Sequence, residues 1–342
     1  MKKFKYIFLL ITYNVLLITS SKGQDIHFSQ FFNNPLLTNP ANTGFIPDAD
    51  YRLGASYRNQ YSAIMAVPYK TMSIYGDAQV FRNRLENGWL GLGGVIIRDV
   101  AGSGSLTSTK AYASVAYHQM LGNSSLLTAG FNIGWANKRI DQTKLKFPDQ
   151  FDGKFFDNGL PTGVVLNNNN VSYLDVQAGL NYAYFPTENV YVNAGYSVHH
   201  VNRPLESFLD ASADTTRISM RHIGFLNAIL KVNENVIINP NIYFTTQAKA
   251  KELVLGMNAA YNLSGDGSKQ LLGGLYYRMG DAIVPTVGFE LNNIRFTFSY
   301  DVTTSALKTF NRMQGASEFN VLRKGFYSDY SGDRSQSLCP TF

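Results

Sequence analysis

The chain has 342 residues, of which 13% are aromatic and only 16% are charged, and it contains a single cysteine. Soluble domains average about 25% charged residues, so this composition indicates an apolar solvent or a very large core, and one cysteine excludes an internal disulfide framework and a cysteine-based zinc site. The formal net charge is +6, but four lysines lie in the first 23 residues and the remainder is close to neutral, which argues against a nucleic-acid partner.

The first 23 residues have the layout of a cleaved secretory signal. A lysine-rich start precedes an apolar stretch from Tyr6 to Ile18, and small residues precede the expected cleavage after Gly23. A retained membrane helix is the alternative, but the apolar run is interrupted at Tyr13 and Asn14 and falls short of the ~20 residues needed to span a bilayer. No cysteine lies near the cut, so a lipoprotein anchor is not expected. The sequence therefore predicts export.

Residues 24–50 form the second unit. The stretch "QDIHFSQFFNNPLLTNPANTG" is too apolar for a solvated tail and too broken by Pro and Asn for a regular helix or strand. Its role depends on what the rest of the chain builds.

From residue 51 onward the dominant signal is strict alternation of apolar and polar residues. In "LLTAGFNIGWANK", Phe131, Ile133 and Trp135 share one face, and Thr128 and Asn132 lie on the other. Fourteen segments show this period of two: 51–58, 69–80, 89–98, 106–118, 125–137, 172–185, 189–200, 218–231, 235–247, 252–262, 269–279, 283–292, 294–301 and 316–327.

A soluble sandwich would also alternate, and three features favour a membrane barrel. The segments approach the ~9–11 residues that a tilted strand needs to cross a bilayer. Their polar faces suit a wet or plugged lumen, and their apolar faces tend to end in aromatic residues, as at a membrane interface. Hydrocarbon leaves no partner for an open sheet edge, so the sheet must close. We therefore predict an all-β fold, a transmembrane antiparallel up-and-down β-barrel of about 14 strands over residues 51–327, with a C-terminal extension at 328–342.

The connections support this assignment. Those after the even-numbered segments are short, and the long ones, around 138–171 and 201–217, follow odd-numbered segments. Bacterial barrels have short periplasmic turns and longer extracellular loops. Pro240 and Pro285 lie inside predicted strands, where a proline removes a ladder donor, so we expect bulges or strand ends there.

Within a barrel, residues 24–50 become a plug-like segment. We expect Phe28, Phe31, Phe32 and Leu36 to pack into the lumen or its periplasmic mouth. Turn residues would lead the chain into the first strand: Pro35, Asn39, Pro40 and Gly44.

Candidate catalytic and metal-binding residues are few. His199, His200 and His222 suggest a metal site, but neighbouring strand residues point to opposite faces and cannot chelate together. Ser197, His199 and Asn193 invite comparison with outer-membrane lipid hydrolases, although such an arrangement is defined by geometry rather than sequence. Glycine clusters at 91–94 and 102–104 precede no helical pattern, so a phosphate loop is not expected. We expect no enzyme activity and no cofactor.

The best candidates for contact with a partner lie in two loops. Around 138–171, aromatic residues alternate with acids, which is typical either of a compact loop over the barrel mouth or of a surface that grips a partner protein. A Ca²⁺ site is the weaker alternative, because no spaced ligand motif is present. The candidate partner residues are Asn59, Gln60, Tyr61, Phe147, Asp149, Phe151, Asp152, Phe155 and Phe156.

The start of the exported chain resembles a known family. The stretches "QDIHFSQFFNNPLLTNPANTG", "YRLGASYRNQYSAI" and "PYKTMSIYGDA", with "KLKFPDQFDG", "SYDV" and the closing "CPTF", are similar to the PorP/SprF family of type IX secretion outer-membrane proteins. The last segment, "SEFNVLRKGFYSDY", departs from the family's Gly-rich, aromatic pattern, so the end of the barrel is less defined.

The resemblance implies an outer-membrane barrel of a Gram-negative, Bacteroidota-like cell that supports protein export. Its expected partners are a secreted cargo or adhesin, bound through its type IX C-terminal domain, other type IX components and outer-membrane lipid. Two alternatives remain: a channel for hydrophobic solutes such as fatty acids, and an outer-membrane enzyme. Polar lumen residues, among them Asp175, Asn181, Asn239 and Arg295, argue against a continuous apolar path for a solute.

Overall fold

The computed structural model describes residues 25–327 apart from 83–84, 86, 103, 146, 158, 165–167 and 209–216. The predicted signal peptide and the extension at 328–342, with Cys339, lie outside the described residues.

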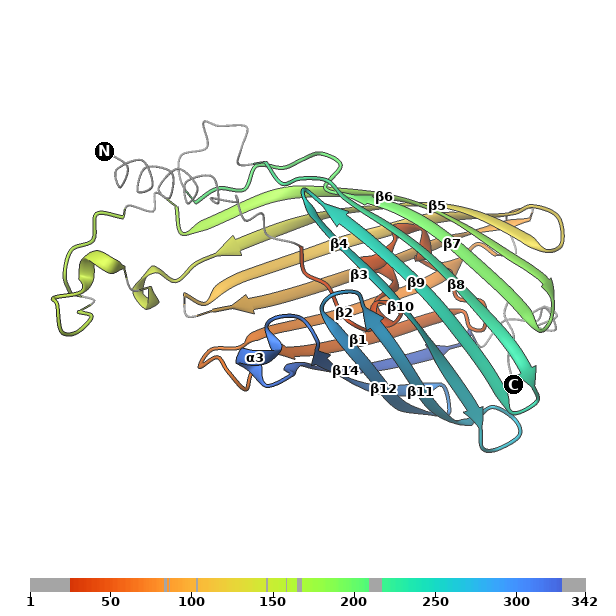
Figure 1. Ribbon diagram of the computed structural model, residues 1–342. Coiled ribbons are helices and arrows are strands. Elements are labelled where there is room, and N and C mark those ends of the chain that lie inside the picture. Colours follow the sequence, from red (N-terminus) through yellow and green to blue (C-terminus); the bar gives the residue numbers. More distant parts are fainter. Residues whose placement is uncertain are drawn as a thin grey trace, which may run out of the picture.

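Fourteen antiparallel strands form a closed barrel in which the first strand pairs with the last (Figure 1). The strands are β1 (Tyr51–Gln60), β2 (Tyr69–Val80), β3 (Gly88–Ala101), β4 (Leu106–Met120), β5 (Ser125–Arg139), β6 (Asn170–Thr187), β7 (Val190–His199), β8 (Arg221–Asn233), β9 (Val236–Gln247), β10 (Ala250–Asn262), β11 (Lys269–Arg278), β12 (Ala282–Leu291), β13 (Ile294–Thr303) and β14 (Gln314–Gly325). The predicted fold is confirmed, and each strand overlaps one predicted segment. The last strand ends at Gly325.

The burial pattern is the reverse of that of a soluble protein. On β5, Phe131 and Ile133 are 57% and 56% exposed on the outer wall, whereas Thr128 and Asn132 are 1% and 0% exposed inside the barrel. The outer face is therefore apolar and the lumen polar, as expected for strands that meet lipid. Among the described residues, no helix is long and apolar enough to cross a membrane.

The two ends of the barrel differ. One end carries only short connections, and the other carries the long loop at 140–169, with the short helices η3 (Gln142–Lys144) and η4 (Pro148–Gln150), and the segment at 304–313, with α3 (Lys308–Asn311). We call these the short-turn end and the long-loop end. Three connections at the long-loop end, 102–105, 248–249 and 279–281, are also short, so the sorting is incomplete.

Both prolines sit within strands and interrupt one ladder each. Pro240 pairs with β10, but the ladder between β8 and β9 has a gap beside it, and the Asn239 side chain donates to the Ala228 carbonyl oxygen across this gap. Pro285 pairs with β11, and the ladder between β12 and β13 has a corresponding gap. Each missing donor is thus accommodated on one side of its strand only.

The segment before β1 lies inside the ring of strands, where Figure 1 shows it in red. It contains three short helical turns: η1 (Phe31–Asn33), α2 (Pro35–Thr38) and η2 (Pro40–Asn42). We call residues 25–50 the plug segment. It runs along the lumen, because Asp25 contacts the long-loop ends of the strands and Asp48 contacts Lys324 near the short-turn end.

Candidate functional site: the plugged lumen

The start of the plug segment is held at the long-loop end by a charged cluster. The Asp25 carboxylate accepts hydrogen bonds from Lys110 and from His200, whose other ring nitrogen contacts Asp175 at 2.8 Å. Arg221 donates to the Ile26 carbonyl oxygen at 3.2 Å. Burial alone would raise the pKa of the Asp25 carboxyl, but the charges of Lys110, His200 and Arg221 hold it well below its ordinary value. Asp25 is therefore a buried, ionised anchor.

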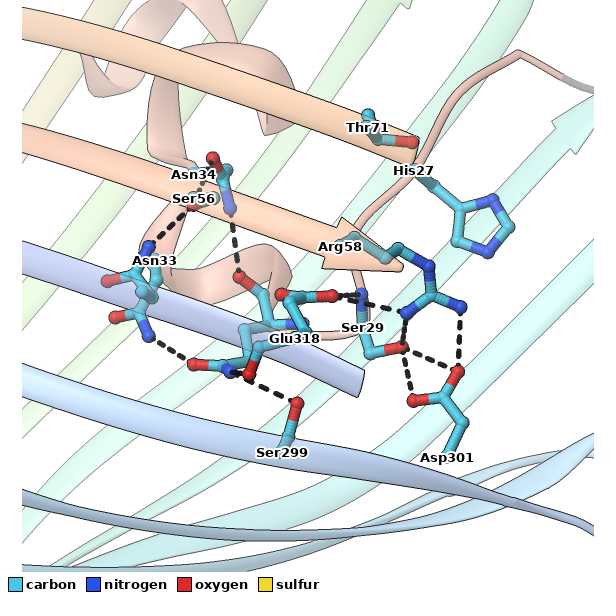
Figure 2. A network of polar contacts seen from close by, with 12 residues as sticks. His27, Ser29, Asn33, Asn34, Ser56, Arg58, Thr71, Ser299, Asp301 and Glu318 are labelled. Carbon is cyan, nitrogen blue, oxygen red and sulfur yellow. Dashed lines mark hydrogen bonds and ion pairs between the residues drawn. The ribbon is translucent and has the colours of Figure 1, made fainter. Parts of the chain in front are cut away.

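A second anchor follows within five residues and is shown in Figure 2. Glu318, which is 0% exposed, accepts hydrogen bonds from the backbone amides of Ser29 and Gln30 at 2.8 and 3.0 Å. Arg58 spans Asp301 at 2.8 Å and Glu318 at 3.2 Å. Arg278 also reaches Asp301, at 3.0 Å. Two arginines and two carboxylates from four strands thus close around the plug backbone, so that each buried charge has a partner.

His27 lies between these anchors. Its imidazole is 3.4 Å from Glu252. Burial, reinforced by Arg278, Arg58 and Arg221, lowers the pKa of His27 to about 4 although Glu252 acts in the opposite sense. At neutral pH His27 is therefore uncharged, so its contact with Glu252 is not an ion pair.

Aromatic packing secures the middle of the segment. Phe31 stacks on Tyr243 with ring centroids 4.7 Å apart, and Phe32 stacks on Tyr276 at 5.2 Å. Phe28 and Leu36 are buried. These residues lie in the lumen.

The wall has glycines where the plug backbone comes closest. A Cβ added to Gly130 would lie 2.5 Å from the backbone of Pro40 and Ala41, and one added to Gly179 would lie 1.9 Å from the Asn39 side chain. Asn39 also donates to the Leu180 carbonyl oxygen at 2.9 Å. These glycines therefore form a cradle for residues 39–41.

Glycines also lie at a second close contact between the plug segment and the wall, at residues 43–44. Gly44 has a φ of 66°, and its amide donates to Asp77 at 2.7 Å. A Cβ on Gly91 would lie 1.9 Å from the Thr43 carbonyl oxygen. The glycine cluster at 91–94 lies within β3, and its Gly91 permits the close approach of the plug backbone.

The long-loop half of the lumen contains a cavity of about 40 Å³ between the plug segment and the wall. The short-turn half contains a cavity of about 360 Å³. The plug segment therefore occupies the two halves unequally.

The candidate partner residues are distributed differently from the prediction. Asn59 and Gln60 belong to the end of β1, so the loop begins only at Tyr61, with a φ of 61°. Extension of the ladder with β14 through Gln60 explains this difference.

In the long loop, the rings of Phe151 and Phe156 pack together with their centroids 5.1 Å apart, and Phe155 is 67% exposed. Asp149 and Asp152 accept hydrogen bonds from loop groups, Asp149 from Gly163 and Asp152 from Phe155. The Phe147 amide donates to Gln150. The loop thus folds on itself and still presents an aromatic side chain to solvent.

The three candidate histidines, His199, His200 and His222, contact different groups. Ser197 donates to the Thr38 carbonyl oxygen at 2.8 Å and lies 3.4 Å from His199, so this pair is covered by the plug segment. His222 contacts Tyr196 at 2.7 Å on the outer wall, away from His200. Among the described residues, no group of three His, Cys, Asp or Glu side chains is placed to hold a metal ion.

A closed fourteen-strand barrel with an apolar exterior and a polar lumen occupied by its own N-terminal segment is an outer-membrane barrel. The sequence profile of the type IX secretion system membrane protein PorP/SprF matches residues 20–322. The chain belongs to this family.

Solved structures show the same fold. The Pseudomonas putida toluene transporter TodX is 14% identical, with a TM-score of 0.53, over 86% of this chain and 94% of that one. The Ralstonia pickettii toluene transporter TbuX is 11% identical, with a TM-score of 0.51 and the same coverage of both chains. A FadL homologue from Pseudomonas aeruginosa is 9% identical over 86% of this chain and 94% of its own, with a TM-score of 0.51. No protein with a curated description matches the sequence.

Proposed function

We propose that this barrel supports export and cell-surface anchoring of a secreted protein or adhesin, held through the C-terminal domain of that protein. In this role the barrel is a binding protein and not an enzyme. Its further partners are other type IX secretion components.

Membership of the type IX secretion family is the observation that carries the proposal. The asymmetry of the barrel supports it: the longest connections lie at one end, and two of their aromatic side chains, Phe155 and Phe310, are 67% and 77% exposed. Exposed aromatic side chains are enriched in protein interfaces. Long loops of bacterial barrels face the cell exterior, so these side chains are available to an exported partner.

Surface retention of the cargo tests the proposal. Phe155→Glu together with Phe310→Glu should release cargo from the cell surface into the medium, because two apolar contacts are replaced by charges. Leu121→Glu is the matched control, since Leu121 is 48% exposed in the turn at the opposite end. Undiminished surface cargo in cells that lack the whole protein would refute the proposal.

The likeness to toluene transporters favours a second candidate function, a channel for hydrophobic solutes. It requires an apolar path, whereas the long-loop half of this lumen is crossed by the ion pairs of Arg58, Asp301 and Glu318. Uptake of a labelled monoaromatic hydrocarbon by proteoliposomes would support the second candidate, and surface loss of cargo would not be expected from it.

A further inference from the structure

The cavity of about 360 Å³ lies between the plug segment and the wall formed mainly by β7–β13. It occupies the short-turn half, because Tyr191, Ile237 and Gln270 at the starts of three strands line it together with Ala260 near the end of β10. Its volume is within the ~300–1,000 Å³ typical of ligand sites.

One part of the lining is aromatic and apolar. Phe32 and Phe45 contribute from the plug segment, and Phe225, Ile229 and Leu272 contribute from the wall. The stacking of Phe32 on Tyr276 fixes the position of this ring. The surface suits an apolar side chain.

The other part is a row of amides in register across adjacent strands. Asn193, Asn227 and Asn241 face one another on β7, β8 and β9. Asn227 donates to Asn241 at 2.7 Å, and Asn241 donates to the Tyr276 hydroxyl at 3.2 Å. Asn258 on β10 donates to the same hydroxyl. These contacts hold the row rigid.

Two acceptors in the lining have no partner in the described structure. The Asn193 Oδ1 and Thr286 Oγ1 atoms are buried without a hydrogen bond, and the two residues are 7% and 5% exposed. An unsatisfied buried polar atom costs about 1–3 kcal/mol, and the other amides of the lining add further donors and acceptors, so a ligand with hydrogen-bonding groups is favoured over a hydrocarbon.

The charges at the mouth are balanced. Arg52 pairs with Asp77 at 2.8 Å, Arg295 pairs with Glu290 at 2.6 Å, and Lys324 contacts Glu290 at 3.3 Å. Lys324 also pairs with Asp48. Burial would raise the pKa of the Asp48 carboxyl, but the charges of Lys324 and Arg295 hold it below its ordinary value. Each of the three cations in the lining therefore has a carboxylate partner, which disfavours a free anion such as a fatty acid.

We propose that this cavity binds an uncharged, extended peptide segment of a partner protein, with an aromatic or branched side chain against Phe32 and Phe225 and backbone N–H groups on the amide row. The segment enters from the short-turn end. The choice of a peptide over other ligands with donors rests on the proposed secretion function, whereas the site itself rests on the lining.

The probe is acetyl-Gly-Phe-Gly-amide, titrated onto the full-length protein in detergent and followed by ligand-observed NMR. Ala260 faces the lumen with Asn258 and Asn262, and Ala259 shares the outer face with Met257 and Tyr261. Ala260→Trp should fill the cavity and weaken binding at least about tenfold. Met257→Trp, on the outer face of the same strand and outside the lining, is the control that should leave binding unchanged. The heat-dependent gel mobility of a folded barrel verifies that both variants fold.

Asn193→Leu separates a peptide from an apolar solute. Removal of the unpaired acceptor should weaken the peptide by roughly fivefold, whereas laurate in the same cavity would bind more tightly. Equal binding of acetyl-Gly-Ala-Gly-amide, insensitivity to Ala260→Trp, or binding of laurate or maltotriose but not of the peptide would overturn the inference. Failure of the unmodified protein to bind the peptide, with cargo still retained on the cell surface, would refute the cavity site alone and leave the proposed function intact.

Discussion

Both halves of the lumen are lined by polar residues, but these residues act differently in each half. In the long-loop half, Asp301 and Glu318 are paired with arginines and with the plug segment, and a cavity there measures about 40 Å³. In the short-turn half, amides and aromatics surround a cavity of about 360 Å³, and its lining includes Asn193 Oδ1 and Thr286 Oγ1, which have no hydrogen bond in the described structure.

The difference shows what polar residues do in a barrel. Buried charges are tolerated only when each has a partner, so they hold the plug segment in one position. A neutral amide that lacks a hydrogen-bond partner costs less free energy than an unpaired buried charge, so amides can remain partly unpaired and be available to a ligand. One half is therefore an anchor and the other a site.

Removal of residues 25–48 should have the largest effect. Without the plug segment the polar lumen is continuous from end to end, so the single-channel conductance in planar bilayers should rise by an order of magnitude or more. Barrel closure is verified by gel mobility, since β1 and β14 remain intact. A closed, non-conducting barrel after this deletion would show that the segment is not what fills the lumen.

Loss of one arginine should lower the free energy of unfolding more in the long-loop half than in the short-turn half. Arg58→Ala leaves Glu318 and Asp301 short of a partner, and we expect a loss of about 3–5 kcal/mol in the free energy of unfolding. Arg295→Ala is the matched variant at the mouth, where the side chain is 29% exposed and Lys324 still contacts Glu290, so about 1 kcal/mol or less is expected. Denaturant titrations in bilayers measure both, and equal losses would contradict the distinction.

A side chain in the cradle should displace the plug segment. Gly130→Val places a Cβ at 2.5 Å from the backbone of Pro40 and Ala41, so we expect faster proteolysis of residues 25–48. Gly273→Val is the control, because a Cβ there meets no atom within 4 Å. Equal cleavage rates for the two variants would argue against the close fit.

The smallest effect should be pH dependence of plug docking. The pKa of His27 falls from 6.5 to about 4 in the docked state, so the undocked state binds the proton more readily between these values. Docking is then fully supported above pH 6.5 and weakens as pH falls toward 4, by at most about 3 kcal/mol.

His200 acts in the opposite sense. Burial would lower the pKa of His200, but its hydrogen bonds to Asp175 and Asp25 raise it above 6.5. Its contribution to plug docking is therefore complete below pH 6.5 and does not change in the pH range where His27 titrates. His27→Gln should abolish the difference in channel opening between pH 6.5 and pH 4.5. Persistence of that difference in the variant would assign it to another group.

Local pattern predicts the strands well because the period of two is imposed by lipid on one side and the lumen on the other. Phe131 and Asn132 are neighbours in the sequence, yet Phe131 is 57% exposed and Asn132 is 0% exposed. The sequence predicts Phe28, Phe31 and Phe32 in the lumen or its periplasmic mouth, because this segment is too apolar for a solvated tail and too broken by Pro and Asn for a strand of the wall.

The anchors were missed for a physical reason. Ser29 and Glu318 are 289 positions apart and meet only because β1 and β14 close the barrel. Alternation alone could have placed Arg58, Asp301 and Glu318 on the lumen face, but their mutual distances depend on the register between strands. The reach of β1 to Gln60, which removed two residues from the predicted loop, depends on the same register.

The plugged lumen is tested most directly by hydrogen–deuterium exchange of residues 25–48 in the folded protein. The backbone amides of Ser29, Gln30 and Gly44 donate to buried carboxylates, so they should exchange as slowly as the strands. Exchange of these amides within seconds, as in an unfolded chain, would contradict a segment anchored inside the barrel.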